Sequence, residues 1–261
     1  MMVPHKGVDP FAIKALGREI ELAGYRRLII KSDQEPSSLE LIQAVMRERS
    51  EDIEEMATEQ SPVGEHQSNG QVERAIQSIQ GQIRTMILSL ESRYKMKLKE
   101  DHPIMAWLVR HAAMLINIIK VGQDGRTAYE RRKGRKFNRP LPEIGECIMY
   151  LNPKSVGVDK LDPRWEQGIF AGLREESGEI YVMNNQGVIK VRSFSQRVEE
   201  ERWNQEEFNQ AEGIPWEPIP GRTGVEIKAR FQFKDLAAEP VIKAPVTRES
   251  TTRRLYINKD D

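Results

Sequence analysis

Apolar residues recur at helical spacing near the start of the chain, and a short apolar run follows them. Residues 10–23 place alanine, leucine and isoleucine on one face, with Asp9 before them and Gly24 after them. This pattern predicts a helix that Asp9 caps and Gly24 ends. The run RRLIIKSD, residues 26–33, predicts a short buried strand.

A second helix and a second strand are predicted next. Ser37 and Ser38 can cap a helix that continues to about Arg49, because its apolar residues share one face. Residues 52–59 predict a strand, although their sequence has little of the β-branched and aromatic content that strands favour. The alternation of strands and helices predicts an α/β domain.

Two longer helices and a basic segment complete the first half. Residues 72–90 carry apolar side chains at three-and-four spacing, which predicts a long amphipathic helix. Residues 103–120 are apolar on nearly every side and should form a buried helix. From Lys120 to Pro140 there are eight Lys or Arg and two acids, so we expect a basic linker over residues 121–140.

Short alternating runs follow, separated by Gly, Pro and Asn turns. ECIMYLN, GIFAGL, EIYVMNN and GVIKVRSF have the spacing of a small all-β barrel, predicted over residues 141–203. Its aromatic side chains are expected in the core rather than at a base-stacking surface: Tyr150, Trp165, Phe170, Tyr181 and Phe194. Residues 204–261 are polar and Pro-rich, and we expect them to be extended or disordered.

Composition narrows the class of protein. The 261 residues include 40 Lys or Arg and 40 Asp or Glu, so overall charge indicates no partner. The single cysteine, Cys147, excludes an internal disulfide and a cysteine-based zinc cluster, and the four histidines have no ligand spacing. Because we find neither a signal peptide nor a membrane span in the sequence, we expect an intracellular protein that does not contact membranes.

Two acids carry the candidate chemistry. Asp33 follows the first predicted strand, and Glu73 lies near the start of the long helix, after the turn SPVGEHQSNG. If the fold brings them to one edge of the sheet, their carboxylates are suitable ligands for Mg²⁺. Two such ions could bind the attacking oxygen and the leaving oxygen of a phosphoryl displacement. The alternatives are a turn or cap residue for Asp33 and a solvated helix face for Glu73.

The stretch SPVGEHQSNGQVERAI resembles the last catalytic motif of retroviral and retrotransposon integrases, in which a Pro-containing turn and a Gly precede the catalytic Glu. LIIKSDQE resembles the second-acid motif of that family, and WLVRHAAMLIN with GRTAYERRKGRK is similar to its following helix and basic segment. LPEIGECIMYL and the runs after it resemble the SH3-like barrel of copia-type elements. The resemblance covers about residues 10–200.

The resemblance implies a fold and an activity. Residues 1–120 would be a partial ribonuclease-H-like core that holds Mg²⁺ or Mn²⁺ through Asp33 and Glu73. The family reaction is polynucleotidyl transfer, in which a DNA 3′-hydroxyl attacks a target phosphate. Its partners would be element ends and target DNA, with homo-oligomers in the parent protein and a nuclear integration step.

The sequence also departs from the family pattern. The family uses three acids, and the only Asp before Asp33 is Asp9, which we interpret as a helix cap; the family's His/Cys zinc-binding region is not found either. We therefore expect the first catalytic acid to lie upstream and this chain alone to be weak or inactive. The alternatives are a catalytically dead DNA-binding and assembly module, and a ribonuclease-H-type nuclease, which has no reason to carry the barrel.

Two groups of residues are candidates for DNA contact. Gln77, Gln80 and Arg84 share the helix face of Glu73, where amides can bond phosphates or bases without adding charge. The basic segment adds five cations that could contact phosphates: Arg131, Arg132, Lys133, Arg135 and Lys136. The alternatives are a solvated helix face for the first group, and a nuclear address or a solvated linker for the second.

Overall fold

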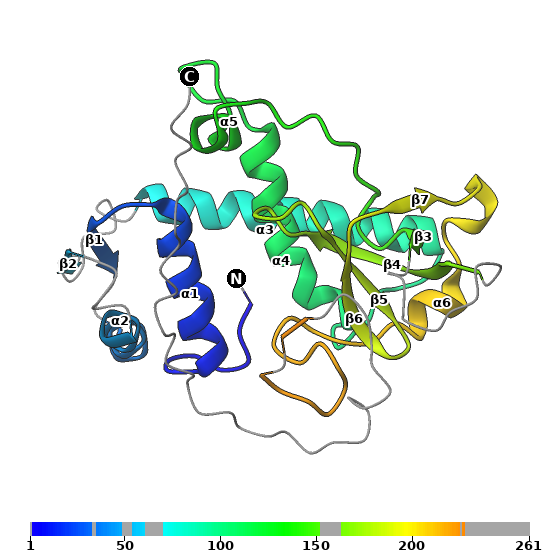
Figure 1. The fold of residues 1–261 in the computed structure, drawn as a ribbon, viewed down its shortest axis with the longest axis horizontal. Helices are drawn as coiled ribbons and strands as arrows, with labels where there is room; N and C mark the ends of the chain where they lie inside the picture. The colour runs from blue at the N-terminus through cyan, green and yellow to red at the C-terminus, as the bar shows by residue number, and fades with distance from the viewer. Residues whose placement is uncertain are drawn as a thin grey trace, which may run out of the picture. The chain divides into compact units, whose positions relative to one another are not determined.

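The computed structural model describes residues 2–32, 35–48, 54–60, 70–151, 163–224 and 226–227. Within these ranges the chain is a mixed α/β protein with one two-stranded and one five-stranded sheet (Figure 1). In chain order the elements are α1 (Pro10–Ala23), β1 (Arg27–Ser32), α2 (Pro36–Glu48), β2 (Glu55–Gln60), α3 (Gly70–Tyr94), α4 (Ile104–Ile119), α5 (Ala128–Lys133), β3 (Cys147–Leu151), β4 (Trp165–Leu173), β5 (Ile180–Asn184), β6 (Gly187–Val191), β7 (Phe194–Gln196), the 3₁₀ turn η2 (Glu199–Glu201) and α6 (Gln205–Asn209).

Helix α1 begins and ends where its sequence predicts. The Asp9 carboxylate accepts hydrogen bonds from the backbone N–H groups of Phe11, at 2.8 Å, and Ala12, at 3.1 Å. Gly24 ends the helix in the left-handed region, with φ of 73°, a conformation that glycine adopts without steric cost. Asp9 is thus a helix cap, as predicted.

Helix α2 starts earlier than expected. Its first residue is Pro36, so Ser37 and Ser38 lie inside the first turn and the prediction that they cap the helix is wrong. The carbonyl of Glu35 accepts from the N–H groups of Ser38 and Leu39. Proline is favoured at the first helical position because its fixed φ suits the helix and its missing N–H would be unpaired there.

Strands β1 and β2 pair in parallel, but β1 is not the buried strand that we predicted. Ile29 is 67% exposed. Its neighbours on the same face, Arg27 and Lys31, form cross-strand ion pairs at 3.9 Å with Glu55 and at 3.3 Å with Glu59. The exposed residues alternate along β1 with the half-buried ones, so one face of this sheet is solvated.

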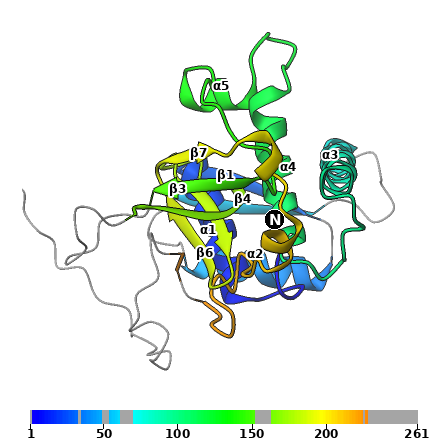
Figure 2. The ribbon, with the colours of Figure 1, turned by 90° about the vertical axis from the view of Figure 1, so that its right-hand side faces the viewer.

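Helices α3 and α4 pack against each other, and α4 packs on strand β4 (Figures 1 and 2). Helix α4 is largely buried, as predicted, with Trp107 and Leu108 at 1% and 0% exposure. Helix α3 is fully buried in this core only in its second half, through Met86, Leu90 and Tyr94. The main core of the described chain therefore lies between the end of α3, α4 and the five-stranded sheet.

The predicted strands of the second half form an antiparallel sheet in the order β6-β5-β4-β3-β7. The last strand, β7, returns to pair with the first, β3. The core prediction is confirmed for Tyr150, Phe170 and Tyr181, and Phe194 is partly buried. It is wrong for Trp165, which is 42% exposed because it is the first residue of β4, at the end of the sheet.

The basic segment is more ordered than a linker. Thr127 caps α5 in a capping box: its hydroxyl accepts from the N–H of Glu130 at 3.1 Å, and the Glu130 carboxylate accepts from the N–H of Thr127 at 2.7 Å. A Thr followed three residues later by Glu is a sequence signature of this cap. The expectation of a plain linker over 121–140 was therefore wrong at residues 127–134.

The predicted disordered tail begins later than expected. Residues 204–224 are ordered, with α6 placing Phe208 in the core at 0% exposure. The Trp107 indole N–H donates to the carbonyl of Gly213 at 3.1 Å. The prediction of an extended tail is wrong for this part, because single apolar residues within its polar sequence pack into the core. Residues 228–261 lie outside the described ranges.

Candidate active site and basic segment

The parallel pair β1–β2 defines the edge at which the candidate acids would meet. Ser32, the last residue of β1, is the register partner of Gln60, the last residue of β2. In a parallel pair the carboxyl ends of both strands lie at the same edge. The chain therefore leaves the sheet toward Asp33 and toward the α3 motif from one edge, although Asp33 itself lies outside the described residues.

Glu73 lies in the first turn of α3 and is exposed to solvent. A carboxylate is stabilised there by the positive end of the helix dipole. No hydrogen bond or ion pair joins it to another residue in the described part of the chain.

The first two turns of α3 lack the packing that we predicted for them. Val72 and Ile76 are 58% and 48% exposed, whereas Ile79 and Ile83, further along the stripe, pack on the core. The apolar stripe of this amphipathic helix therefore does not anchor the turns around Glu73. Anchoring begins about two turns after this residue.

Gln77, Gln80 and Arg84 are all exposed on α3. Their spacing from Glu73, at i+4, i+7 and i+11, places the four residues along one side of the helix. The predicted polar face is consequently accessible. Whether it contacts DNA stays a prediction.

Among the described residues, Glu73 is the candidate metal ligand at this site. No group of three or more His, Cys, Asp or Glu in the described ranges could hold a metal ion. Mg²⁺ needs only one or two carboxylates beside its waters and a phosphate, and Glu73 is chemically suited to be one of them. The Ser32 hydroxyl oxygen, at the same sheet edge as the Asp33 position, is buried and has no hydrogen-bond partner among the described residues.

Arg131 is engaged within its own segment. Its guanidinium donates to both carboxylate oxygens of Asp124, at 2.9 Å and 2.6 Å. This hydrogen bonding holds the pKa of the Asp124 carboxyl well below its usual range and raises the pKa of Arg131. A phosphate would have to compete with Asp124 for this guanidinium.

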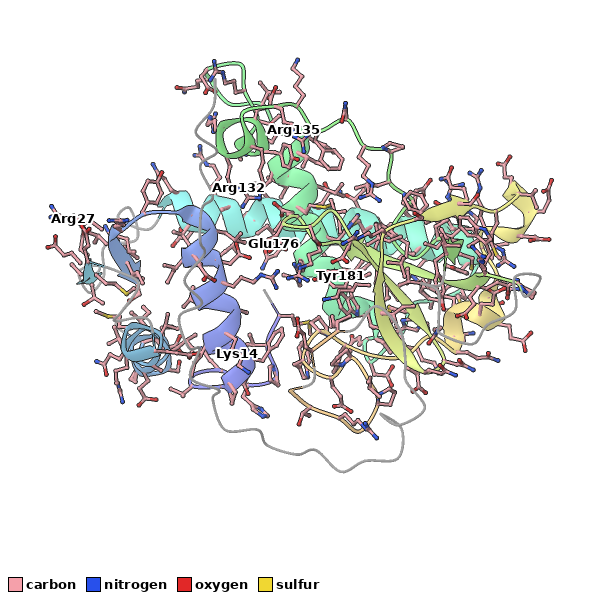
Figure 3. The ribbon with its side chains drawn as sticks, in the orientation of Figure 1. Lys14, Arg27, Arg132, Arg135, Glu176 and Tyr181 are labelled. Carbon is pink, nitrogen blue, oxygen red and sulfur yellow. The ribbon has the colours of Figure 1, made fainter. Side chains whose placement is uncertain are left out.

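Arg132 is engaged by a different element. It forms an ion pair with Glu175, in the turn between β4 and β5. Lys133, Arg135 and Lys136 are exposed, and in the described part of the chain no ion pair involves them; Figure 3 labels Arg132 and Arg135. The five predicted phosphate contacts therefore divide into two paired arginines and three open cations.

The structural roles of an acidic turn and of a buried histidine were not predicted from the sequence. Residues 174–179, REESGE, form a turn whose acids bind arginines from several elements, and the acidic run was its visible signal. His111 is buried at 4% exposure, and its Nδ1 has no partner in the described ranges. Burial lowers the pKa of His111 to about 4, so its side chain is neutral at pH 7.

No helix among the described residues is both long and apolar enough to cross a lipid bilayer. Comparison with known proteins found no family model and no curated protein that matches this chain. The geometry of the chain and the motif resemblance are consequently the basis for proposing a function.

Proposed function

We propose that this chain is part of a retrotransposon integrase and contributes to Mg²⁺- or Mn²⁺-dependent polynucleotidyl transfer. In this reaction a DNA 3′-hydroxyl attacks a phosphate of the target strand. Asp33 and Glu73 would be metal ligands, and the ions would neutralise charge at the phosphorus. Gln77, Gln80, Arg84 and the basic segment would contact DNA.

The observation that carries the proposal is the pairing of Ser32 with Gln60 at the end of two parallel strands. Asp33 follows Ser32 directly, and the segment that leads to Glu73 follows Gln60. The second half of a ribonuclease-H-like core is expected to have this order of elements: a strand, a helix, a parallel strand and then a helix that carries an acid. The edge where parallel strands end is also where α/β folds place their sites.

The second half of the chain supports the same proposal. A five-stranded antiparallel sheet in which β7 returns to β3 is the connectivity expected of a small SH3-like barrel. Such a barrel follows the core in the family that the sequence resembles. We therefore propose residues 141–203 as that domain.

A strand-transfer assay on labelled DNA ends, with Mg²⁺ or Mn²⁺, tests the activity. We expect weak joining by this chain, stronger joining by any longer product of its reading frame, and a loss of at least ~100-fold in Asp33→Asn or Glu73→Gln. Glu100→Gln, which neutralises an exposed acid outside the motif, should join ends normally. Equal joining by Glu73→Gln and the wild type would reject the site.

A second candidate function is a catalytically dead module that binds DNA or assists assembly. The observation that favours it is the exposure of Val72 and Ile76 beside Glu73, because a catalytic group must be held firmly by its surroundings. This candidate predicts DNA binding without joining, and the same binding in Glu73→Gln as in the wild type.

A further inference from the structure

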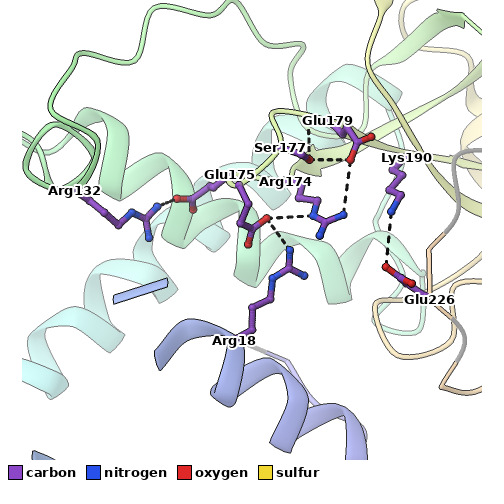
Figure 4. A network of polar contacts seen from close by, with 9 residues as sticks. Arg18, Arg132, Arg174, Glu175, Ser177, Glu179, Lys190 and Glu226 are labelled. Carbon is purple, nitrogen blue, oxygen red and sulfur yellow. Dashed lines mark hydrogen bonds and ion pairs between the residues drawn. The ribbon is translucent and has the colours of Figure 1, made fainter. Parts of the chain in front are cut away.

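The turn between β4 and β5 gathers arginines from separate elements around its acids (Figure 4). We call residues 174–179 the acidic turn. Glu175 binds Arg132 of α5, and Glu176 binds Arg18 of α1 at 2.9 Å. One turn of the sheet thus neutralises cations that come from two different helices.

The remaining ion pairs of the acidic turn also involve arginine. Arg174 lies 3.3 Å from Glu176 and 3.8 Å from Glu179. Arg192 lies 3.8 Å from the other oxygen of Glu179. Each of the three carboxylates therefore has at least one guanidinium partner.

The acids of this turn are less exposed than three of the arginines that bind them. The side chains of Glu175, Glu176 and Glu179 are 20%, 20% and 13% exposed. Their partners Arg18 and Arg132 are 35% and 32% exposed, and Arg192 is 89% exposed. These three arginines are therefore more accessible to solvent than the carboxylates that they bind.

Positive charge is in excess around the acidic turn. Arg110 lies over the ring of Tyr181, with its Cζ 5.1 Å from the ring centroid. Burial opposes the charge of Glu176, but a backbone hydrogen bond and the charges of Arg18, Arg110 and Arg174 outweigh it, so the pKa of Glu176 is lowered. Five arginines, 18, 110, 132, 174 and 192, surround three carboxylates.

We propose that the acidic turn competes with DNA: Glu175 holds Arg132 in the free protein, and a backbone phosphate replaces Glu175 when DNA binds. The inference rests on the proposed function for the identity of the anion. The exchange is one ion pair for another, with the release of a counterion from the DNA. Glu175 thus lowers the affinity of the basic segment for polyanions in general.

The expected size of the effect follows from the exposure of this pair. An exposed ion pair contributes ~0.2–1 kcal/mol, which corresponds to about a 1.4- to 5-fold change in affinity. Glu175→Gln should therefore bind duplex DNA up to about 5-fold more tightly at low salt. Because a phosphate contacts Arg132 in the bound state of both proteins, the log–log salt slope should be nearly the same, and the gain should appear as a similar factor at each salt concentration.

The test measures the salt dependence of binding to labelled duplex DNA and, separately, elution from heparin, for the wild type, Glu175→Gln, Arg132→Gln and the double variant. We expect Glu175→Gln to bind both polyanions more tightly, and the double variant to lose this gain. Arg132→Gln alone should change the affinity little, since the phosphate contact that it loses is offset by the ion pair with Glu175 that no longer has to break. Glu201→Gln is the matched control, because it removes the same charge while Arg197 remains bound to Glu207 at 2.8 Å and 3.0 Å.

Measuring binding to both DNA and heparin distinguishes a failure of this inference from a failure of the proposed function. A later heparin elution of Glu175→Gln, with no protein binding duplex DNA, would support the competition and reject the DNA function. Unchanged or earlier elution of Glu175→Gln, or a gain that persists in the double variant, would overturn the inference. An equal gain in Glu201→Gln would also overturn it, because net charge alone would then explain the effect.

Discussion

The hydroxyl of Tyr94, the last residue of α3, donates a 2.6 Å hydrogen bond to the carbonyl oxygen of Gly145, two residues before β3. Both groups are buried, and the ring of Tyr94 stacks on Phe208 with centroids 4.1 Å apart. This bond joins the long helix to the start of the five-stranded sheet. It therefore connects the helix of Glu73 to the second half of the chain.

Tyr94→Phe should destabilise the protein. The phenylalanine ring keeps the stacking but leaves the buried Gly145 carbonyl without this donor, at a cost of ~1–3 kcal/mol. Urea unfolding followed by circular dichroism measures the loss. Tyr25→Phe, at a side chain that is 70% exposed, should change nothing; equal stability of Tyr94→Phe and the wild type would contradict the role of this bond.

Gly187→Ala should destabilise the protein by at least ~2 kcal/mol. Gly187 has φ of 125°, and an added Cβ would lie 2.2 Å from the carbonyl oxygen of Pro218. Gly24→Ala is the matched control, because Gly24 also has a positive φ, of 73°, but nothing lies within 4 Å of its added Cβ; it should cost only ~1 kcal/mol. Similar melting temperatures for the two variants would show that residues 210–224 do not pack on β6.

The free energy of unfolding should fall as the pH falls, because His111 takes up a proton more readily in the unfolded chain than in the folded protein. Because burial lowers its folded pKa to about 4, from 6.5, the unfolded chain binds more protons between these values. Its contribution is complete above pH 6.5 and is lost as the pH falls toward 4, at a total of ~3 kcal/mol.

Urea unfolding at pH 7 and at pH 4.5 measures this effect. The wild type should lose more free energy of unfolding between these conditions than His111→Gln does. His5→Gln, at an exposed position, should behave as the wild type. An identical pH dependence for His111→Gln and the wild type would exclude His111 as the cause.

Replacement of Lys133, Arg135 and Lys136 by alanine should reduce the log–log salt slope of DNA binding by about 2–3. These cations have no ion-pair partner in the described ranges, whereas Arg131 is held by Asp124. Arg131→Ala should therefore reduce the slope by less than about 0.9. Fluorescence anisotropy over a salt series gives both values.

The control for that experiment is a second triple variant, in which Lys95, Lys97 and Lys99 become alanine. It removes the same charge from the segment between α3 and α4. A slope change as large as that of the first triple variant would mean that binding follows net charge and not the basic segment.

Local sequence signals predicted the elements well wherever one residue type has a strong positional preference. Asp9 and Gly24 define the ends of α1, and the apolar runs 147–151 and 180–184 are strands. Helix α2 begins at Pro36 and is not capped by Ser37, because the fixed φ of proline suits the first helical position.

Long-range relationships were not predictable in the same way. The pairing of Arg132 with Glu175 depends on how the chain brings together residues 43 positions apart. The burial of Phe208 likewise depends on partners, Tyr94 and His102, that are remote in sequence. Periodicity reports which face of an element is apolar but not what covers it, which is why the exposure of Val72 and Ile76 was also unforeseen.

Phe208 determines where this protein can be shortened for expression. Its ring lies between Tyr94 and His102, with centroids 4.1 Å and 4.3 Å away. A version that ends after the last strand, at residue 203, would leave those two rings uncovered and prone to aggregation. Cloning boundaries for crystallisation should therefore keep residues through 227, beyond the sheet itself.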